Sequence, residues 1–568
     1  MITGPETPAR PAPLSSYRTP GVRIEWLDAP PQQPVLARTD ITGFVGVAER
    51  GPLHQPVLVE SFEQYIGVFG TGRAQGNLPY AVEGFFANGG TRCWVVRAAD
   101  PARARFAFLD LPLTTGPDSG GRLHLTATSP GTWGNRIRAT LQPDPLHHGR
   151  FTLVLRMGAV LEIWRDAGVD PNGRRFVVSV LGGGGSATGS RLVTAAWTPG
   201  PWRSERPRTT EHAGTTELGL AGGADGLTTL TPRHLAGSHP PSQDPWGVAA
   251  LDAIDEIGIV CVPDCWTTRR PASTTPTPLP RDCAHPEAPA ARADLPADRA
   301  PERLDLSDDQ AASLQHDVVA HCEARGDRVA LLDAPPGTVP RALEWRAGAP
   351  SSAYAAAYYP WLRVVDPDST TGAVVEVPPS GHVAGICGRV DASPGVHKPP
   401  AGEVVELGVD TATPLDDLDH GDLNEAGVNA LRAGRTVQVM GARTLSRDSQ
   451  WTYLNVRRLA IMIERTVERA AAWTVFEPNS GRLQAEITRV VTGVVEEVWR
   501  RGMLSGATRE QAYRVVCNAS NNPVEDVLAG RLVCLVYLNP PPPAEFVVLR
   551  IVREPTAVTA AGGGGGNG

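Results

Sequence analysis

The sequence predicts an α+β protein of several domains, and three observations support this class. The chain has 568 residues, which is enough for several units of roughly 100–200 residues each. Hydrophobic residues make up 41% and charged residues 20%, as in soluble proteins that bury a large core. Helical and strand-like patterns alternate along most of the chain, whereas residues 101–224 carry short alternating strands and many turns. We therefore expect an α/β core that is interrupted by a β-rich insertion.

Residues 1–40 predict an extended arm and its linker. In "VRIEWL" the apolar side chains alternate with charged ones, which is typical of a strand. These apolar residues are Val22, Ile24 and Trp26. Pro30 and Pro31 follow and separate this strand from the rest of the chain.

Residues 41–100 predict a compact α/β start. "ITGFVGVA" is an apolar run typical of a buried strand, and "RCWVVRAA" predicts a second strand. Between them, "SFEQYIGVFG" and "PYAVEGFFANGG" predict two helices, the first of which begins with Ser61 as its N-cap.

Residues 101–224 predict an inserted β-rich domain. "FTLVLRMGAVLEIWRD" predicts a hairpin, and "RRFVVSVLGGG" predicts a strand that ends in a flexible turn. The insertion is expected to end near the Asp-Gly turn in "AGGADG".

Residues 225–385 are expected to complete the middle α/β domain together with 41–100. "PWGVAALDAIDEIGIVCVPD" predicts a helix that runs into a strand, and "DQAASLQHDVVAHCEARGDRVALLDAP" predicts another such pair. Between them, residues 267–305 are rich in Pro, Ala and Thr and lack aromatic residues, which favours a long surface loop.

Residues 386–538 predict a C-terminal α/β domain, and its helices have the clearest periodicity in the chain. Apolar residues recur at intervals of three and four within 453–473 and again within 480–502. Gly502 is expected to stop the second helix, and "RLVCLVYL" (531–538) predicts a strand.

Residues 539–568 predict a second arm, which mirrors the first. Prolines from Pro540 to Pro543 form a stiff spacer before the strand-forming run "FVVLRIV". Its candidate pairing residues are Phe546, Val548, Leu549 and Ile551. A glycine tract ends the chain.

Motifs for catalysis or cofactor binding are weak, and we expect neither an enzyme nor a cofactor. The glycine spacing in "FGTGRAQG" is not that of a dinucleotide site, and Lys398, the only lysine, lies outside any phosphate-binding loop. Ser380 and His382 could be read as a nucleophile and a base, but a turn explains this spacing better. Cysteines and histidines could be read as a zinc site, but their spacing is not that of paired ligands. These are Cys261, Cys265, Cys283, His285, His321 and Cys322.

Charge and hydropathy limit the partners of the chain. The formal net charge is −8 and no basic stripe is present, so we expect no nucleic acid partner. No stretch is long and apolar enough to predict membrane insertion, and the first residues do not resemble a secretory signal. We expect the chain to fold in the bacterial cytoplasm, with its eight cysteines reduced.

Several motifs together resemble the contractile tail sheath proteins of phage tails, R-type pyocins and extracellular injection systems. At the start these are "YRTPGVRIEW", "ITGFVGVAERGP" and "SFEQYIGVFG". Others follow in the same order as in the family: "SPGTWGNRI", "LAGGADG", "HCEARGDRVALLDAP", "SAYAAAYYPWLRVVDP", "VPPSGHVAGICGRVDASPGVHKPPAGE", "WTYLNVRRLAIMIERTVERAAAWTVFEPNS" and "AEFVVLRI". The resemblance spans nearly the whole chain except parts of 101–224 and 267–305.

The resemblance implies a structural subunit that polymerises helically around an inner tube and contracts without nucleotide chemistry. It implies that both terminal arms are exchanged between subunits, that the insertion faces outward, and that the C-terminal domain lies at the inner radius. Arg500 and Arg501 are then candidate contacts with the inner tube, with a solvated helix end as the equal alternative. Baseplate and terminal cap proteins are the other implied partners, in a phage tail or a tail-like particle. A non-contractile tail or capsid protein and a Ser/His or zinc hydrolase are the rival classes.

Overall fold

The computed structural model describes the chain in nine segments. They are residues 34–116, 119–144, 150–182, 189–199, 217–237, 245–266, 303–369, 371–474 and 477–543. The expected arm residues from Val22 to Pro31 and from Phe546 to Ile551 therefore lie outside the described residues.

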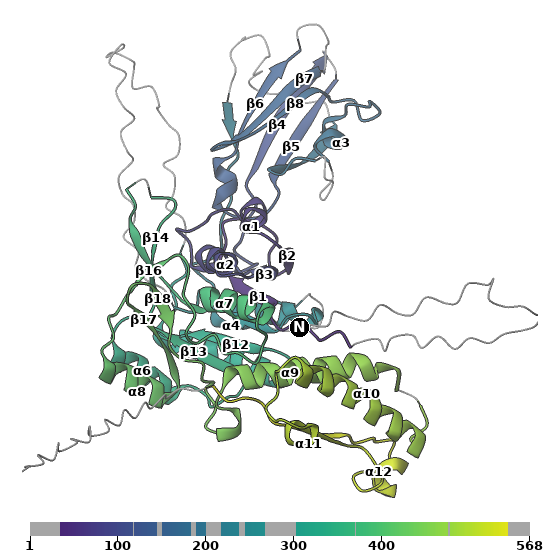
Figure 1. The fold of residues 1–568 in the computed structure, drawn as a ribbon. Helices are drawn as coiled ribbons and strands as arrows, with labels where there is room; N and C mark the ends of the chain where they lie inside the picture. Colours follow the sequence, from purple (N-terminus) through teal and green to yellow (C-terminus); the bar gives the residue numbers. More distant parts are fainter. Residues whose placement is uncertain are drawn as a thin grey trace, which may run out of the picture.

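An eight-stranded sheet forms the core of the molecule (Figure 1). Its strands, in spatial order, are β18 (Val437–Val439), β17 (Val428–Ala433), β13 (Ala355–Tyr359), β12 (Val329–Asp333), β11 (Ile259–Cys261), β1 (Thr42–Gly46), β3 (Cys93–Arg97) and β2 (Val57–Val59). The six inner strands are parallel, and the two edge strands are antiparallel to their neighbours. The central strands are buried along their whole length, which is why they read as continuous apolar runs.

Helices cover both faces of this sheet. One face packs against α1 (Phe62–Phe69), α2 (Leu78–Ala87) and α7 (Ser380–Ala392). The other packs against α4 (Pro232–Ala236), the 3-10 helix η3 (Gly247–Ala253) and α5 (Asp308–Arg325). Helices α6 (Val339–Gly348) and α8 (Asp417–Ala426) pack beside β17 around a smaller apolar cluster.

Several of these elements form where local sequence patterns predict them. Ser61 caps α1 by accepting a hydrogen bond from the Gln64 backbone, as the sequence predicts. The helix expected before β11 is instead the tighter η3. Three short strands that the sequence analysis does not assign form a separate sheet: β14 (Leu362–Val365), β15 (Val374–Val377) and β16 (Gly408–Thr411).

The expected β-rich region consists of two sheets around one apolar cluster, and it rises above the core in Figure 1. One sheet contains β4 (Phe108–Gly116), β5 (Ser119–Ala127) and β9 (Val193–Pro199). The other contains β10 (Glu217–Gly219), β6 (Arg138–Pro143), β7 (Arg150–Met157) and β8 (Val160–Gly168), and η2 (Thr132–Arg136) leads into it. The predicted hairpin is β7 and β8.

One strand prediction in this region is wrong. Within "RRFVVSVLGGG" the structure has a short helix, α3 (Val177–Leu181). Val177 and Leu181 are both buried, and their spacing of four places them on one helical face. The dense apolar run satisfies strand and helix patterns equally, so packing decided between them.

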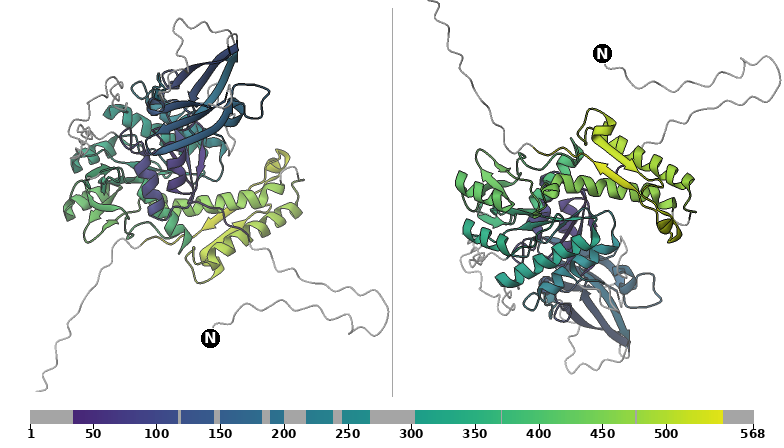
Figure 2. Two further views of the ribbon diagram at one scale, coloured as in Figure 1. Left: turned by 90° about the horizontal axis from the view of Figure 1, so that it is seen from above. Right: turned by 90° about the horizontal axis from the view of Figure 1, so that it is seen from below.

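The last unit contains two long helices and a two-stranded ribbon (Figure 2). Helices α9 (Leu454–Ala471) and α10 (Gly481–Arg500) pack against each other and against β19 (Tyr513–Val516) and β20 (Leu535–Leu538). The remaining elements are η4 (Ser449–Trp451), η5 (Ala472–Thr474), α11 (Arg509–Ala512) and α12 (Val524–Leu528). The expected domain boundary at 385/386 falls inside α7, and β17 and β18 belong to the core sheet.

Candidate functional site: the arm-root clamp and the C-terminal ribbon

The described chain begins with residues 34–40, which contact both α9 of the last unit and α7 of the core. We call this segment the arm root, because it is the last part of the expected N-terminal arm and linker, residues 1–40. Leu36 packs against the apolar cluster of α9 and α10, and Ala37 is buried. The Ala37 amide donates to Thr466 Oγ1 on α9 at 2.9 Å.

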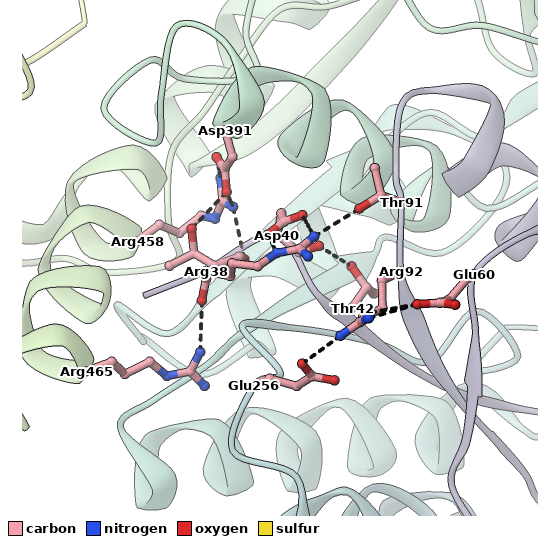
Figure 3. A network of polar contacts seen from close by, with 11 residues as sticks. Arg38, Asp40, Thr42, Glu60, Thr91, Arg92, Glu256, Asp391, Arg458 and Arg465 are labelled. Atoms are coloured by element: carbon pink, nitrogen blue, oxygen red, sulfur yellow. Dashed lines mark hydrogen bonds and ion pairs between the residues drawn. The ribbon is translucent and has the colours of Figure 1, made fainter. Parts of the chain in front are cut away.

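Two helices hold the arm root through a buried ion pair (Figure 3). Arg458 on α9 donates from Nη1 to Asp391 Oδ1 on α7 at 3.0 Å, and from Nη2 to the second carboxylate oxygen. The same Nη2 donates to the Thr39 carbonyl at 3.2 Å, and the Thr39 hydroxyl donates to Asp391 at 2.8 Å. Arg458, Asp391 and Thr39 therefore form a closed triangle that we call the arm-root clamp.

A second arginine of α9 extends the clamp to the core sheet. Arg465 Nη1 donates to the Arg38 carbonyl at 3.3 Å, and Nη2 donates to the Ile257 carbonyl just before β11. Arg465 also lies 3.7 Å from a carboxylate oxygen of Asp327. One side chain thus ties α9, the arm root and the start of two core strands together.

On the outer side of the arm root, the ion pairs are more exposed. Arg38 pairs with Asp40 and donates to Thr91 Oγ1 at 2.9 Å. Nearby, Arg92 pairs with Glu60 and lies 3.4 Å from a carboxylate oxygen of Glu256. Such half-exposed pairs contribute little free energy each, so the buried triangle carries most of the attachment.

Burial and charge act against each other at the clamp. Burial lowers the pKa of Arg458, because it disfavours the charged guanidinium. The nearby Asp391 carboxylate raises the pKa by a larger amount, so the pKa of Arg458 is raised overall. Burial raises the pKa of Asp391, although Arg458 and Thr39 act in the opposite direction. Removing one partner of a buried ion pair leaves the other charge unpaired, which costs several kcal/mol.

Sequence reasoning missed this clamp. The apolar stripe predicted for α9 includes Leu459, Met462 and Ile463, which are buried as expected. The same pattern places the arginines of α9 on its other faces. Arg458 and Arg465 are nevertheless 1% and 5% exposed. Their spacing of seven places both on one helical face, and this was the signal that could have indicated a second buried face.

The C-terminal ribbon is the second part of the candidate site. Strands β19 and β20 pair with each other from Tyr513↔Leu538 to Val516↔Leu535, and within the described residues neither outer edge carries another strand. After β20, the Asn539 amide donates to the Ala512 carbonyl at 3.0 Å. The proline spacer, Pro540 to Pro543, begins at this point, and the described chain ends with it.

Both predicted inner-tube residues lie at the end of α10 and share one partner. Arg500 and Arg501 pair with Glu497, which is buried, and their hydrogen bonds hold its pKa below the ordinary value. The side chains of Arg500 and Arg501 remain 53% and 47% exposed. They neutralise a buried carboxylate, and their exposed portions can still face a partner.

The rival Ser/His site is not assembled. Ser380 donates from its backbone amide and its Oγ to the Asp333 carboxylate at 2.8 and 2.7 Å, which holds the start of α7 against β12. His382 is 1% exposed and its ring covers Gly84 of α2, where an added Cβ would lie 2.5 Å from Cε1. Ser380 therefore anchors α7 to β12, and His382 packs at the α2–α7 contact.

The cysteines do not gather into a metal cluster in the described chain. No group of three or more His, Cys, Asp and Glu side chains there could hold a metal ion. Cys261, Cys265 and Cys322 are buried as free thiols, and His321 lies beside Asp252 at 3.2 Å. Cys283 and His285 lie outside the described residues. None of the helices in the described segments is both long and apolar enough to cross a membrane.

Two family matches lie in the second half of the chain and together span residues 304–553. The phage tail sheath protein central domain matches residues 304–445, and the phage tail sheath C-terminal domain matches residues 446–553. Residues 304–553 therefore carry the central and C-terminal domains of the phage tail sheath family. The clamp joins the two matched domains, since Asp391 lies in the central one and Arg458 in the C-terminal one.

Curated sheath proteins match part of the chain at low identity. The tail sheath protein of Vibrio phage KVP40 is 27% identical over 194 residues, which is 32% of this chain and 27% of that protein. The tail sheath protein of Escherichia phage P2 is 25% identical over 195 residues, 32% of this chain and 46% of that protein. These alignments thus span less than half of either phage protein.

Solved sheath structures share the fold over nearly the whole chain. The anti-feeding prophage helical sheath in its contracted state has a TM-score of 0.52 at 18% identity, covering 95% of this chain and 100% of that chain. A sheath tail protein from Desulfitobacterium hafniense has a TM-score of 0.52 at 12% identity, covering 88% and 93%. The α+β multidomain fold is therefore that of sheath proteins.

Proposed function

We propose that this tail sheath subunit polymerises helically around an inner tube and contracts to drive that tube through a target envelope. The matches of residues 304–553 to two tail sheath domains, and a fold like that of a contracted sheath, support this proposal. Helical polymerisation and contraction are the steps that we add. The observation that carries the proposal is the C-terminal ribbon, whose outer edges carry no further strand within the described residues. The arm root contacts the unit that contains this ribbon, and the proline spacer begins directly after β20.

The ribbon is a suitable acceptor for an exchanged strand. A two-stranded ribbon is marginally stable by itself, and a strand added at an edge would complete its backbone hydrogen bonds. The chain contains two segments whose sequences predict strands, around Val22–Leu27 and Phe546–Val552, and prolines lie between each of them and the described domains. Each backbone hydrogen bond gained on docking contributes roughly 0.5–1.5 kcal/mol.

Strand donation from one copy to another produces an open assembly. The donor arm and the acceptor ribbon are different surfaces, and such heterologous contacts build rings or helical filaments. Proline-rich spacers are already extended, so little conformational entropy is lost when the arm docks. The spacer prolines cannot extend the ladder themselves, which keeps the added strand separate from β20.

The arm-root clamp gives the N-terminal arm a fixed anchor in this scheme. Tension on the arm would pass through Thr39 into α7 of the core and α9 of the last unit together. Subunits could then move as rigid bodies while the arms keep them linked. The free energy for contraction would come from new contacts between subunits.

Further partners belong to the same proposal. The inner tube would contact the α9–α10 unit, with Arg500 and Arg501 as candidates, and baseplate and terminal cap proteins would close the two ends of the sheath. Assembly would occur in the bacterial cytoplasm, and the product would be part of a phage tail or tail-like particle.

Arm deletion tests the proposal. Chains that lack residues 1–33 or residues 544–560 should remain folded monomers by circular dichroism and light scattering, yet form no tubes in negative-stain images. Deletion of the glycine-rich residues 562–568 alone is the matched control and should leave tube formation intact. Tubes formed by either arm-deleted chain would refute strand exchange as the basis of assembly.

A further inference from the structure

Two cysteines face each other at one end of the C-terminal ribbon. The pairs Val515↔Val536 and Val516↔Leu535 set the register of β19 and β20, and continuing this register by one residue places Cys517 opposite Cys534. Both cysteines belong to the ribbon face that packs on α9 and α10. Each thiol lies close enough to the other to shift its pKa.

The backbone around this pair is held in place by side-chain amides. Asn521 donates from Nδ2 to the Val516 and Val533 carbonyls at 3.0 and 2.8 Å. Asn522 accepts a hydrogen bond from the Val533 amide and donates to its carbonyl. The residues that flank the two cysteines are therefore bridged on both strands.

The continued strand register predicts a spacing that suits a disulfide. Residues directly opposite in antiparallel strands have Cα atoms about 4.5–5.5 Å apart, and disulfides span Cα separations of about 4.4–6.8 Å. Two opposite cysteines on one face of a ribbon thus need little backbone movement to form a bond.

We propose that Cys517 and Cys534 are a disulfide-forming pair, reduced in the cytoplasm and oxidised by a small-molecule disulfide such as oxidised glutathione. The thiolate of Cys534, which is the more exposed of the two, attacks one sulfur of the glutathione disulfide and releases one glutathione thiolate. Cys517 then attacks Sγ of Cys534 and releases the second glutathione. Two thiol protons are given up, and two electrons pass to glutathione, which leaves as two thiols.

The remaining described cysteines lack such a pairing. Five of them, Cys93, Cys261, Cys265, Cys322 and Cys387, lie in the core around the eight-stranded sheet and are buried. Within the described residues, Cys517 and Cys534 are the cysteines that the register of two paired strands places opposite each other. Oxidation of the folded chain should therefore be selective for this pair.

Formation of the bond should rigidify the ribbon. It would close the loop from 517 to 534, which contains α12, and a loop of this length lowers the population of the opened hairpin by about a hundredfold. In terms of the proposed function, the ribbon that accepts a neighbouring strand would become fixed once a particle reaches an oxidising environment.

Peptide mapping tests the pair on the folded full-length chain. The protein is incubated with oxidised glutathione at pH 8, blocked by alkylation, digested and analysed by mass spectrometry. We expect one cross-linked peptide that joins Cys517 to Cys534, and the five core thiols alkylated only after unfolding. The variant Cys283→Ser is the matched control and should form the same cross-link.

The variants Cys517→Ser and Cys534→Ser separate a disulfide from simple thiol reactivity. In Cys534→Ser, the buried Cys517 should gain no cross-link, and amide exchange of β19 and β20 should not slow after oxidation. Burial raises the pKa of Cys534 to about 11, helped by the adjacent Cys517, so the rate should rise about tenfold per pH unit from pH 7 to 9.

Two outcomes would overturn the inference. Glutathione adducts on the folded wild-type chain without the 517–534 link would show that the thiols cannot reach each other. A link that forms only in denaturant would show that the folded ribbon forbids it. Neither result depends on tube formation, so the pair can fail while the proposed assembly stands, and the reverse also holds.

Discussion

Arg458 of α9 and Asp391 of α7 form a two-point ion pair in which Nη1 and Oδ1 lie 3.0 Å apart, and both side chains are almost fully buried. The pair lies under Thr39, which contacts both partners. Thr39 and Asp391, which are 352 positions apart in the sequence, are thereby joined. The Arg458–Asp391 pair also joins the two matched sheath domains. This contact joins the core to the last unit together with those of Arg465 and Asn455.

Loss of one partner should destabilise the whole chain. Arg458→Met keeps the length of the side chain but leaves Asp391 buried without its partner, so we expect a loss of about 3–5 kcal/mol in the free energy of unfolding. Urea unfolding measures this value. Arg489→Met, at an arginine on α10 whose side chain is 78% exposed, is the control and should change stability by less than about 0.5 kcal/mol. Equal effects of the two variants would contradict the clamp.

Removal of one hydrogen bond that holds the arm root should affect the structure only near that segment. Thr466→Val removes the acceptor of the Ala37 amide while preserving the shape of the side chain. We expect faster hydrogen exchange at the Ala37 amide and a loss of about 1 kcal/mol. The amides of β12 should exchange as in the parent chain. Unchanged exchange at Ala37 would mean that the arm root is held by other contacts.

Local sequence patterns predicted those elements that are determined by residues within the element itself. The cap at Ser61, the apolar stripes of α9 and α10, and the buried parallel strands depend on residues within one element. The prediction of a strand at the short helix α3 is wrong because its run of valines fits both periods.

The clamp could not be predicted in this way. Arg458 and Thr39 are 419 residues apart, and a buried arginine has the same sequence pattern as a solvated one until its partners are known. The contact between Ser380 and Asp333 was missed for the same reason, since the sequence suggested only the neighbouring His382.

Asp333 should make stability depend on pH. Burial raises the pKa of this carboxyl to about 7, against the hydrogen bonds from Ser380 that lower it. Because the native pKa exceeds the ordinary value of 3.8, the folded chain binds a proton that the unfolded chain has released. The associated stability is present below about pH 4 and is lost as pH rises through about 7, by up to about 4 kcal/mol.

The variant Asp333→Asn tests this dependence. It keeps an acceptor for the Ser380 amide and removes the titrating proton, so its free energy of unfolding should change less between pH 5 and pH 8 than that of the parent chain. Urea unfolding at both pH values gives the comparison. Parallel pH profiles for the two proteins would show that Asp333 does not titrate in this range.

Gly493 in α10 and Gly502 just after it should respond to alanine in opposite directions. Gly502 follows the helix with φ +74°, and the amides of Gly502 and Met503 donate to the Trp499 and Val498 carbonyls. Gly502→Ala should cost about 1 kcal/mol because alanine is strained at this φ. Gly493 lies in the helix, and a Cβ there meets no atom within 4 Å, so Gly493→Ala should stabilise by about 0.5–1 kcal/mol. Thermal unfolding should order the three proteins accordingly.

Variants at the end of α10 can separate a loss of inner-tube binding from a loss of folding. Arg500 and Arg501 neutralise the buried Glu497, so charge reversal at the arginines would also damage the end of α10. Glu497→Gln removes the buried negative charge that the two arginines neutralise, and we expect this single variant to fold and to co-assemble with the tube.

The triple variant Glu497→Gln, Arg500→Gln and Arg501→Gln keeps a neutral helix end but loses both positive charges. If these charges face acidic tube residues, the triple variant should form sheath yet bind tube more weakly, with a smaller salt dependence, in co-sedimentation. Equal tube binding by the single and triple variants would assign Arg500 and Arg501 to the solvated helix end alone.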